Sequence, residues 1–279
     1  MEIVARRLAP ALAGEVIESV LAPGINAVKT FDPPLHDLAG ARFTGVTRRG
    51  KVLLFGLESE RHGALALLVH LMSAGRMQLP AKRATLRDKT SRLLIRLSED
   101  RELRVREFGT RQAAWVKLLR PDDLEQEESL SALGPEAWPE PPPFAPLLAA
   151  PRPLHTLLRD QRVVAGIGRT WVDDILHAAR LSPFKRGDDL SPAEAEALRA
   201  VTIGELDRVI EHYENTVKLP LPEKFPKPVR VHGLQGQPCP RCGGTLEAVF
   251  YEDYVMTYCP ACQTEGRVLK DRRLSRLLK

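Results

Sequence analysis

The placement of the four cysteines is the feature that most constrains this chain, because all of them fall within the last 41 of its 279 residues. They form two CxxC pairs with sixteen residues between the pairs. Two thiolates from each pair can close a tetrahedron around one ion, and this spacing is typical of a structural zinc site. Disulfides or free thiols are the alternative. The sequence predicts one structural Zn²⁺ held by Cys239, Cys242, Cys259 and Cys262.

The residues around the cysteines indicate what such a site serves. The segment between the pairs, TLEAVFYEDYVMTY, is rich in β-branched and aromatic residues and predicts a two-stranded hairpin. A metal then substitutes for a core that so short a segment cannot build. A basic tail follows, which favours contact with phosphates, although a solvated tail is the alternative. Its cations are Arg267, Lys270, Arg272, Arg273, Arg276 and Lys279.

Charge and hydropathy narrow the class of protein. The net charge is +5 and the isoelectric point about 9.1, which fits either an ordinary protein or one with a polyanionic partner. No apolar run approaches the roughly 18 residues of a membrane span. The N-terminal stretch carries charges throughout and lacks the apolar core of a signal peptide. We therefore expect a cytoplasmic protein, in which paired cysteines more often bind metal than form disulfides.

Hydrophobic periodicity divides the rest of the chain into a strand-rich and a helical part. Residues 2–22 predict a first helix. From 40 to 120, short apolar runs separated by turns predict antiparallel strands in a two-sheet sandwich. Residues 121–153 are acidic and then proline-rich, which is typical of a linker. Residues 154–217 return to helical spacing, and the last helix has Ser191 as its predicted N-cap, with Glu194 completing a capping box.

A glycine pair opens one of these helices. In VVAGIGRTWVDDILHAARLSPF, residues 163–184, Gly166 and Gly168 allow a ligand to approach the backbone closely. The helix that follows offers free N–H groups and the positive end of its dipole, which suits a phosphate. A plain corner between two helices is the alternative.

Taken in order, these segments resemble the bacterial formamidopyrimidine-DNA glycosylase and endonuclease VIII family, over nearly the whole chain. Its motifs are matched by RRGKVLLFGL (48–57), HLMSAGRM (70–77), REFG (106–109), LGPE (133–136), VVAGIGRTWVDDIL (163–176) and the cysteine hairpin.

The resemblance implies an α+β fold with an N-terminal β-sandwich and flanking helix, a helix–two-turn–helix domain and a C-terminal zinc β-hairpin. The expected domains are the sandwich over 1–122, a linker over 123–153, the helix–two-turn–helix over 154–222, and the zinc hairpin with its basic tail over 229–279. The implied function is base-excision repair of damaged double-stranded DNA by a nucleoid-associated monomer. It would be a DNA glycosylase with AP lyase activity, which removes oxidised bases through a Schiff-base intermediate.

The resemblance also assigns roles to single residues. Lys51 matches the catalytic lysine in the family's β-hairpin loop, which touches phosphates and helps to protonate the sugar or the leaving group. Arg106 and Phe108 match the residues that fill the gap left by a flipped base. The other residues expected to contact DNA are Arg92, Gly168, Arg169 and Tyr254.

The sequence departs from the family at its start. The family begins with a proline, whose amine is the nucleophile, and a glutamate that is its acid–base partner. This sequence begins MEIVARRL, and Met1 aligns with a valine about six residues further along the motif. One explanation is a misplaced start at a valine codon read as methionine. The other is a catalytically inactive paralogue that only binds damaged DNA. A zinc-ribbon protein without damage specificity is a third alternative.

Three further departures fall at expected DNA contacts. Arg169 replaces an asparagine that touches a DNA phosphate, and Tyr254 replaces an arginine on the zinc hairpin. The loss of that arginine puts β,δ-elimination in doubt. The methionine of the family's wedge aligns with Ser73, and Met72 lies one place early. A slip of one residue along a strand reverses the face of a side chain, so Met72 is not counted as a wedge residue.

Overall fold

The computed structural model describes residues 1–85, 88–109, 112–251 and 254–269. The chain divides into two compact units. The first comprises Met1–Ala132 and His212–Pro226, and the second Leu133–Glu211 and Lys227–Lys279. Within the described ranges, no helix combines the length and the apolar character that a membrane crossing requires.

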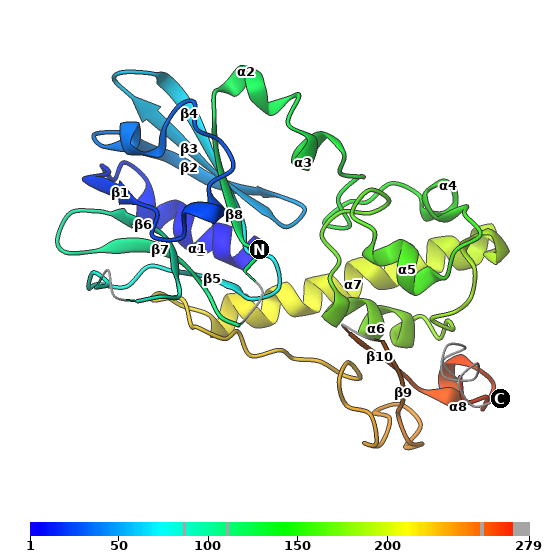
Figure 1. Cartoon of the computed structure of the whole chain (residues 1–279). Helices are drawn as coiled ribbons and strands as arrows, with labels where there is room; N and C mark the ends of the chain where they lie inside the picture. Colours follow the sequence, from blue (N-terminus) through cyan, green and yellow to red (C-terminus); the bar gives the residue numbers. More distant parts are fainter. Residues whose placement is uncertain (86–87, 110–111, 252–253, 270–279) are drawn as a thin grey trace, which may run out of the picture. The chain divides into compact units, whose positions relative to one another are not determined.

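Unit 1 contains two four-stranded antiparallel sheets, which confirms the predicted sandwich (Figure 1). One sheet has the order β2-β3-β4-β8 and the other β1-β6-β7-β5. The strands are β1 (Ser19–Leu21), β2 (Arg42–Arg49), β3 (Val52–Ser59), β4 (Gly63–His70), β5 (Gly75–Gln78), β6 (Ser91–Arg96), β7 (Glu102–Glu107) and β8 (Trp115–Leu119).

The core of unit 1 follows from alternation along these strands. Leu53, Phe55 and Leu57 on β3 are fully or almost fully buried, with less buried residues between them. Phe43 and Phe55 meet edge to face, with ring centroids 6.1 Å apart. Burying a Phe or Leu side chain stabilises the fold by about 2 kcal/mol, so a few such positions fix which face of each strand points inward.

The first helix is shorter than predicted. Helix α1 spans Glu2–Leu12 rather than residues 2–22. Gly14 follows with a φ of +76°, in the left-handed region that favours glycine, and the chain then becomes extended. The Ile17 N–H donates to the Ala41 carbonyl at 2.8 Å. Val16 and Ile17 are apolar at a spacing that resembles a continued helix, but they belong to this extended segment.

Residues 212–226, which follow in sequence from unit 2, are fastened to α1. Arg7 donates to the carbonyls of Glu214 and Val217 at 2.6 and 2.8 Å. Arg6 pairs with the Glu214 carboxylate at 2.8 Å. Two arginines on one face of α1 therefore hold the end of a distant helix within unit 1.

Unit 2 is built around helices, whose apolar faces form one core. They include α4 (Phe144–Leu148), α5 (Leu154–Arg159), α6 (Arg169–Ala178) and α7 (Pro192–Thr216), the last of which continues into unit 1. The segment 121–153, expected to be a linker, contains α4 as well as the one-turn helices α2 (Pro121–Leu124) and α3 (Glu128–Ser131). Phe144 and Leu148 on α4 are fully buried in this core.

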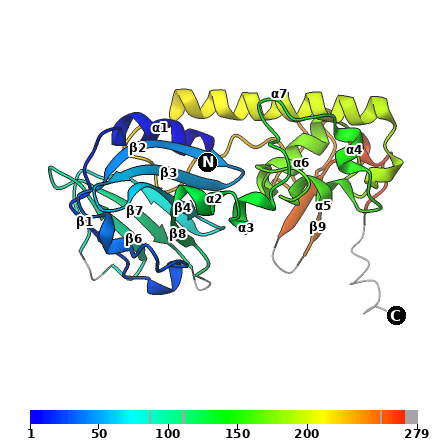
Figure 2. The ribbon, with the colours of Figure 1, turned by 90° about the horizontal axis from the view of Figure 1, so that it is seen from above.

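Helix α7 begins as predicted. The Glu194 N–H donates to the Ser191 Oγ at 3.2 Å, and the Ser191 N–H donates to the Glu194 carboxylate at 2.9 Å. This reciprocal pair confirms the capping box. Figure 2 shows α7 as one long uninterrupted helix.

The cysteine-rich end of unit 2 contains the predicted hairpin. Strands β9 (Glu247–Phe250) and β10 (Val255–Tyr258) pair antiparallel, and the one-turn helix α8 (Pro260–Gln263) follows. Of the basic tail, only Arg267 lies within the described residues, where it is exposed and pairs with Glu265 at 3.2 Å. Lys270, Arg272, Arg273, Arg276 and Lys279 lie outside them.

Candidate metal centre and nucleic-acid interface

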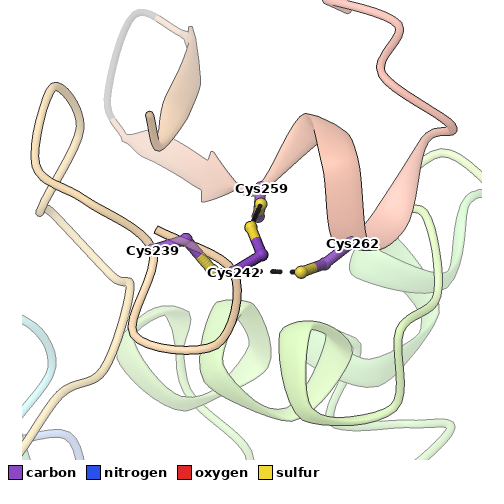
Figure 3. A group of neighbouring side chains, drawn as sticks. All are labelled: Cys239, Cys242, Cys259 and Cys262. Carbon is purple, nitrogen blue, oxygen red and sulfur yellow. Dashed lines mark hydrogen bonds between the residues drawn. The ribbon is translucent and has the colours of Figure 1, made fainter. Parts of the chain in front are cut away.

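The four cysteines converge, and their sulfur atoms all lie within 4.8 Å of one another (Figure 3). Sulfur separations of 3.9 Å (Cys239–Cys262) and 3.5 Å (Cys242–Cys259) are far too long for disulfides. Zinc–sulfur bonds of about 2.3 Å place the sulfurs of one tetrahedron about 3.8 Å apart. The four side chains could therefore hold one metal ion, as the spacing predicted.

Backbone turns position these thiols. The Cys239 N–H donates to the Gly244 carbonyl, and the Gly243 N–H donates back to the Cys239 carbonyl. A hydrogen bond from the Gly244 N–H lowers the pKa of Cys242 to about 7. Burial raises the pKa of Cys259 to about 12. A bound cation would replace the protons on such thiols, so metal binding and folding of this segment are coupled.

The first cysteine turn is attached to the C-terminal end of α6. The Nε2 atom of His177 lies 3.1 Å from the Cys239 sulfur. Arg241, between the first two cysteines, donates to the carbonyls of His177 and Ala178 at 2.8 and 3.1 Å. The His177 carbonyl also accepts the Arg180 N–H at 3.1 Å, so Arg241 adds to the capping of α6 and fixes the turn against it.

Two adjacent carboxylates on α6 hold the segments that enter and leave the cysteine cluster. Asp174 accepts the backbone N–H groups of Arg230, Val231 and His232 at 2.8–3.1 Å. Asp173 accepts from the Thr257 N–H at 3.0 Å and pairs with His232 at 2.7 Å.

His155 on α5 lies 3.2 Å from the other oxygen of Asp173. Burial would raise the pKa of Asp173, but hydrogen bonds from His155 and His232 outweigh it and hold the pKa below its ordinary value. Sequence reasoning missed both carboxylates, and the only signal was an acidic pair inside an otherwise apolar helix face.

In unit 1, Lys51 occupies a tight turn. Residues Gly50 and Lys51 connect β2 to β3, where Arg49 pairs with Val52, and Gly50 has a φ of +55°. Lys51 therefore lies in the hairpin loop predicted for it. On the neighbouring strand, His70 pairs with Val52 across the sheet.

His70 is a site residue that the sequence did not reveal. Its ring stacks on Trp115, with centroids 5.5 Å apart. Burial, followed by the charge of Lys51, lowers the pKa of His70 to about 4. A neutral imidazole therefore lies beside the lysine at neutral pH.

The segment between β4 and β5 changes the interpretation of Met72. It lies in a turn and not in a strand, so strand alternation does not decide where its side chain points. Met72 is 49% exposed and has a φ of +50°, which is uncommon for a residue with a side chain. The Ala74 carbonyl of the same segment accepts the Phe108 N–H at 3.2 Å.

The two residues of REFG that match the family's wedge are in contact with each other. The Arg106 guanidinium lies 4.7 Å from the centre of the half-buried Phe108 ring. Arg106 also donates to the Thr90 hydroxyl at 2.8 Å and pairs with Asp88 at 3.2 Å.

Arg92, which is expected to contact DNA, is buried within unit 1. It is only 6% exposed, and its Nε atom faces the buried Glu107 carboxylate at 3.7 Å. Glu107 also accepts the N–H groups of Ala113 and Ala114. Arg92 thus balances a buried charge inside unit 1, and its contact with DNA stays a prediction.

In unit 2, the glycine pair opens α6 as expected. Gly168 is the N-cap of this helix and has no side-chain capping partner. The exposed Arg169 follows, with its guanidinium carbon 5.8 Å from the centre of the Tyr254 ring. The structure therefore brings Gly168, Arg169 and Tyr254 together, which are three of the residues predicted to contact DNA.

Known proteins are similar to this chain in sequence and in fold. Residues 1–112 match the formamidopyrimidine-DNA glycosylase N-terminal domain, and residues 139–220 match the H2TH domain of the same enzyme. The formamidopyrimidine-DNA glycosylase of Thermus thermophilus is 32% identical over 95% of this chain and 97% of its own length.

Two solved structures of the Lactococcus lactis Fpg protein align with TM-scores of 0.82 and 25% identity. One is in complex with DNA containing N7-benzyl-Fapy-dG, and the other with DNA containing an abasic site. Each covers 94% of this chain, and the alignments cover 97% and 98% of the two Lactococcus chains. The chain belongs to the formamidopyrimidine-DNA glycosylase family, the DNA glycosylases of base-excision repair.

Proposed function

We propose that this protein removes oxidised bases from duplex DNA and then cleaves the strand as an AP lyase, through a Schiff base. The observation that carries the proposal is its similarity to DNA glycosylases along 95% of its length. A binding-only paralogue is not favoured by this kinship. We expect the protein to act as a monomer on chromosomal DNA in the bacterial cytoplasm.

Several residues of unit 1 would carry out different steps of base removal. A damaged base must leave the duplex before it can be attacked, and apolar side chains fill the space that it vacates. Phe108 and the exposed Met72 are the candidates for that wedge. Lys51 would contact the phosphates beside the flipped nucleotide and supply a proton to the sugar or the leaving group. The Nδ1 atom of His70 accepts the Met72 N–H at 3.1 Å, so the other ring nitrogen of the neutral imidazole would donate a hydrogen bond without adding charge.

A Schiff base needs an unprotonated amine that attacks the C1′ carbon of the sugar. The resemblance assigns this amine to an N-terminal proline followed by a glutamate, whereas the present sequence begins Met1-Glu2.

Unit 2 would grip the DNA backbone. We propose that the cysteine cluster binds one structural Zn²⁺, because four thiols close the coordination sphere and leave no position for a substrate. Asp173, Asp174 and His177 connect α6 to the cysteine segment, so the ion would hold the hairpin beside the N-terminus of that helix. The ion's task is to maintain this arrangement.

Borohydride trapping on a duplex with one abasic site tests the proposal. The expected result is a covalent protein–DNA adduct, with peptide mapping to locate the modified amine. Lys51→Ala is expected to lower turnover strongly, whereas Lys29→Ala, which removes a lysine that donates to the nearby Asn26 carbonyl, is expected to keep it. Tight binding without any adduct or base release would refute the lyase and favour a protein that only binds.

A further inference from the structure

We propose that Glu223 is a positioning residue for lesion recognition, which holds the Arg106 guanidinium ready to meet the base opposite a flipped nucleotide. The inference rests on the proposed function, in which Arg106 helps to fill the gap that the flipped base leaves. It adds a residue that no motif of the sequence indicated, since Glu223 lies 117 positions after Arg106. Both residues belong to unit 1.

The backbone of Arg106 is held from two sides. It lies near the end of β7, an inner strand of its sheet, and it is paired with Arg76 on β5 and with Ser91 on β6. A strand with neighbours on both sides gives a side chain a well-defined origin. What remains to be fixed is the direction of the long Arg106 side chain.

Partners at two different nitrogens restrain the guanidinium. Its Nε atom donates to the Thr90 hydroxyl at 2.8 Å and lies 3.2 Å from the Asp88 carboxylate. Its Nη1 atom lies 3.5 Å from the Glu223 carboxylate. Because the group is rigid and planar, two such anchors fix its plane as well as its place. Within the described ranges Nη2 makes no hydrogen bond or ion pair, so its N–H groups are available to an outside acceptor.

Charge balance alone does not account for Glu223. Asp88 already lies beside the Arg106 charge, and it is built into the turn before β6. There it accepts the Thr90 N–H at 2.9 Å, the Thr90 hydroxyl at 2.6 Å and the Ser91 hydroxyl at 3.3 Å. The Glu223 side chain is 50% exposed, and exposed ion pairs contribute little to folding stability. A second carboxylate at the other end of the guanidinium therefore points to orientation.

The segment that carries Glu223 is itself firmly held. Three prolines within residues 219–226, LPLPEKFP, restrict its backbone. Leu221 is buried, and the Phe225 ring packs edge to face on the Tyr213 ring, with centroids 5.7 Å apart. Apolar anchors thus lie on both sides of Glu223, so its carboxylate is presented to Arg106 from a stiff support.

Such restraint favours lesion binding in particular. The base opposite a flipped nucleotide has hydrogen-bonding atoms that have lost their partners, and a donor already aimed at them can bond without being ordered first. Ordering one flexible side chain on binding weakens affinity about 2- to 12-fold. Glu223 restrains Arg106 before DNA arrives and so avoids that loss. An intact duplex has no unpaired base, so the benefit is confined to the lesion.

Titration of the whole protein on two duplexes tests this role, one intact and one with an abasic-site analogue. Glu223→Ala should lower the ratio of lesion affinity to intact affinity about 2- to 12-fold. Loss of a carboxylate by itself favours binding to a polyanion, so weaker binding to the lesion duplex cannot come from the change of charge. Glu223→Gln, which keeps an acceptor oxygen at the same reach, should lose less.

Two further variants separate positioning from other effects. Asp32→Ala removes another exposed carboxylate of unit 1, which pairs with Arg120 at 3.0 Å, and it should leave the ratio unchanged. In an Arg106→Leu background, Glu223→Ala should lower the ratio no further, because a positioning residue acts only through its partner. Thermal melting confirms that each variant is folded.

The outcomes distinguish two failures. If Glu223→Ala keeps or raises the ratio, or lowers it equally when Arg106 is absent, the positioning role is refuted while the proposed function stands. If the wild-type protein binds the abasic and the intact duplex equally, the proposed function fails, and the role of Glu223 fails with it.

Discussion

The Nε2 atom of His177 lies 3.1 Å from the sulfur of Cys239, so a side chain of α6 meets the cysteine cluster from outside. Burial lowers the pKa of His177 to about 4, so the imidazole is neutral at pH 7 and can donate a single ring N–H to the sulfur. Hydrogen bonds of this kind stabilise a thiolate and orient it toward its metal.

The first prediction concerns this contact. Replacing His177 with Phe removes the donor, and outer contacts of this kind typically contribute about 10- to 100-fold to metal affinity. We therefore expect zinc to be lost to a competing chelator at a correspondingly lower chelator concentration. His177→Gln, which retains an N–H donor, should lie closer to wild type, and the exposed His36→Phe should not differ from it. Equal affinity for all variants would show that the contact is only packing.

Metal removal should affect more than the cysteines. Asp173 and Asp174 bind the backbone of the segments on both sides of the cluster, so its collapse should release those N–H groups. After chelation we expect rapid amide exchange at Val231 and Thr257 and loss of affinity for damaged duplex. Amide exchange in unit 1, for example at Leu67, serves as the internal control. Unchanged binding by metal-free protein would contradict the proposed role of the ion.

Asp174 should contribute strongly to the stability of unit 2. Asp174→Asn removes the charge and one acceptor oxygen from a group that holds three backbone N–H donors. Leaving a buried donor unpaired costs about 1–3 kcal/mol. Denaturant unfolding of the whole chain should show a loss of that size. Asp189→Asn, at an exposed position, is the matched control, and similar losses for both would refute the assignment.

The His70 environment gives a pH dependence with a defined sign. Its folded-state pKa of about 4 lies below the ordinary value of about 6.5, so the unfolded chain binds the proton more readily. This group therefore makes stability fall as the pH drops from about 6.5 to about 4. NMR titration of the imidazole should show a midpoint near 4. Lys51→Met should raise that midpoint only partly, because burial is the larger cause. A midpoint near 6.5 in the wild-type protein would disprove the buried, neutral imidazole.

Local rules explain which parts of the fold could be predicted. The capping box of Ser191 and Glu194 lies within four residues, and the Gly50–Lys51 turn is flanked by strongly alternating strands. The family motifs named Gly168, Arg169 and Tyr254 as expected DNA contacts, and the structure places Arg169 beside Tyr254. Each of these predictions depends on residues close in sequence or on a pattern shared with relatives.

Long-range contacts explain what was missed. Asp174 and Val231 lie 57 positions apart, and nothing near either one indicates the other. Arg92 is buried and faces Glu107 on β7, and no local pattern of the sequence indicates that contact. Strand alternation does not apply to Met72, because it lies in a turn between β4 and β5.

The attachment of residues 212–226 to α1 limits how recombination can exchange parts of this gene. Unit 1 is not encoded by one uninterrupted stretch, because its last fifteen residues follow most of unit 2. A recombination event after residue 132 would join the sandwich, with Arg6 and Arg7, to the second half of another protein. These two arginines would then face the carbonyls and carboxylate of a foreign helix. Domain exchange between paralogues is therefore constrained by two hydrogen-bonding arginines. Lineages of this protein should pass on the two units together, as a single gene and not as interchangeable modules.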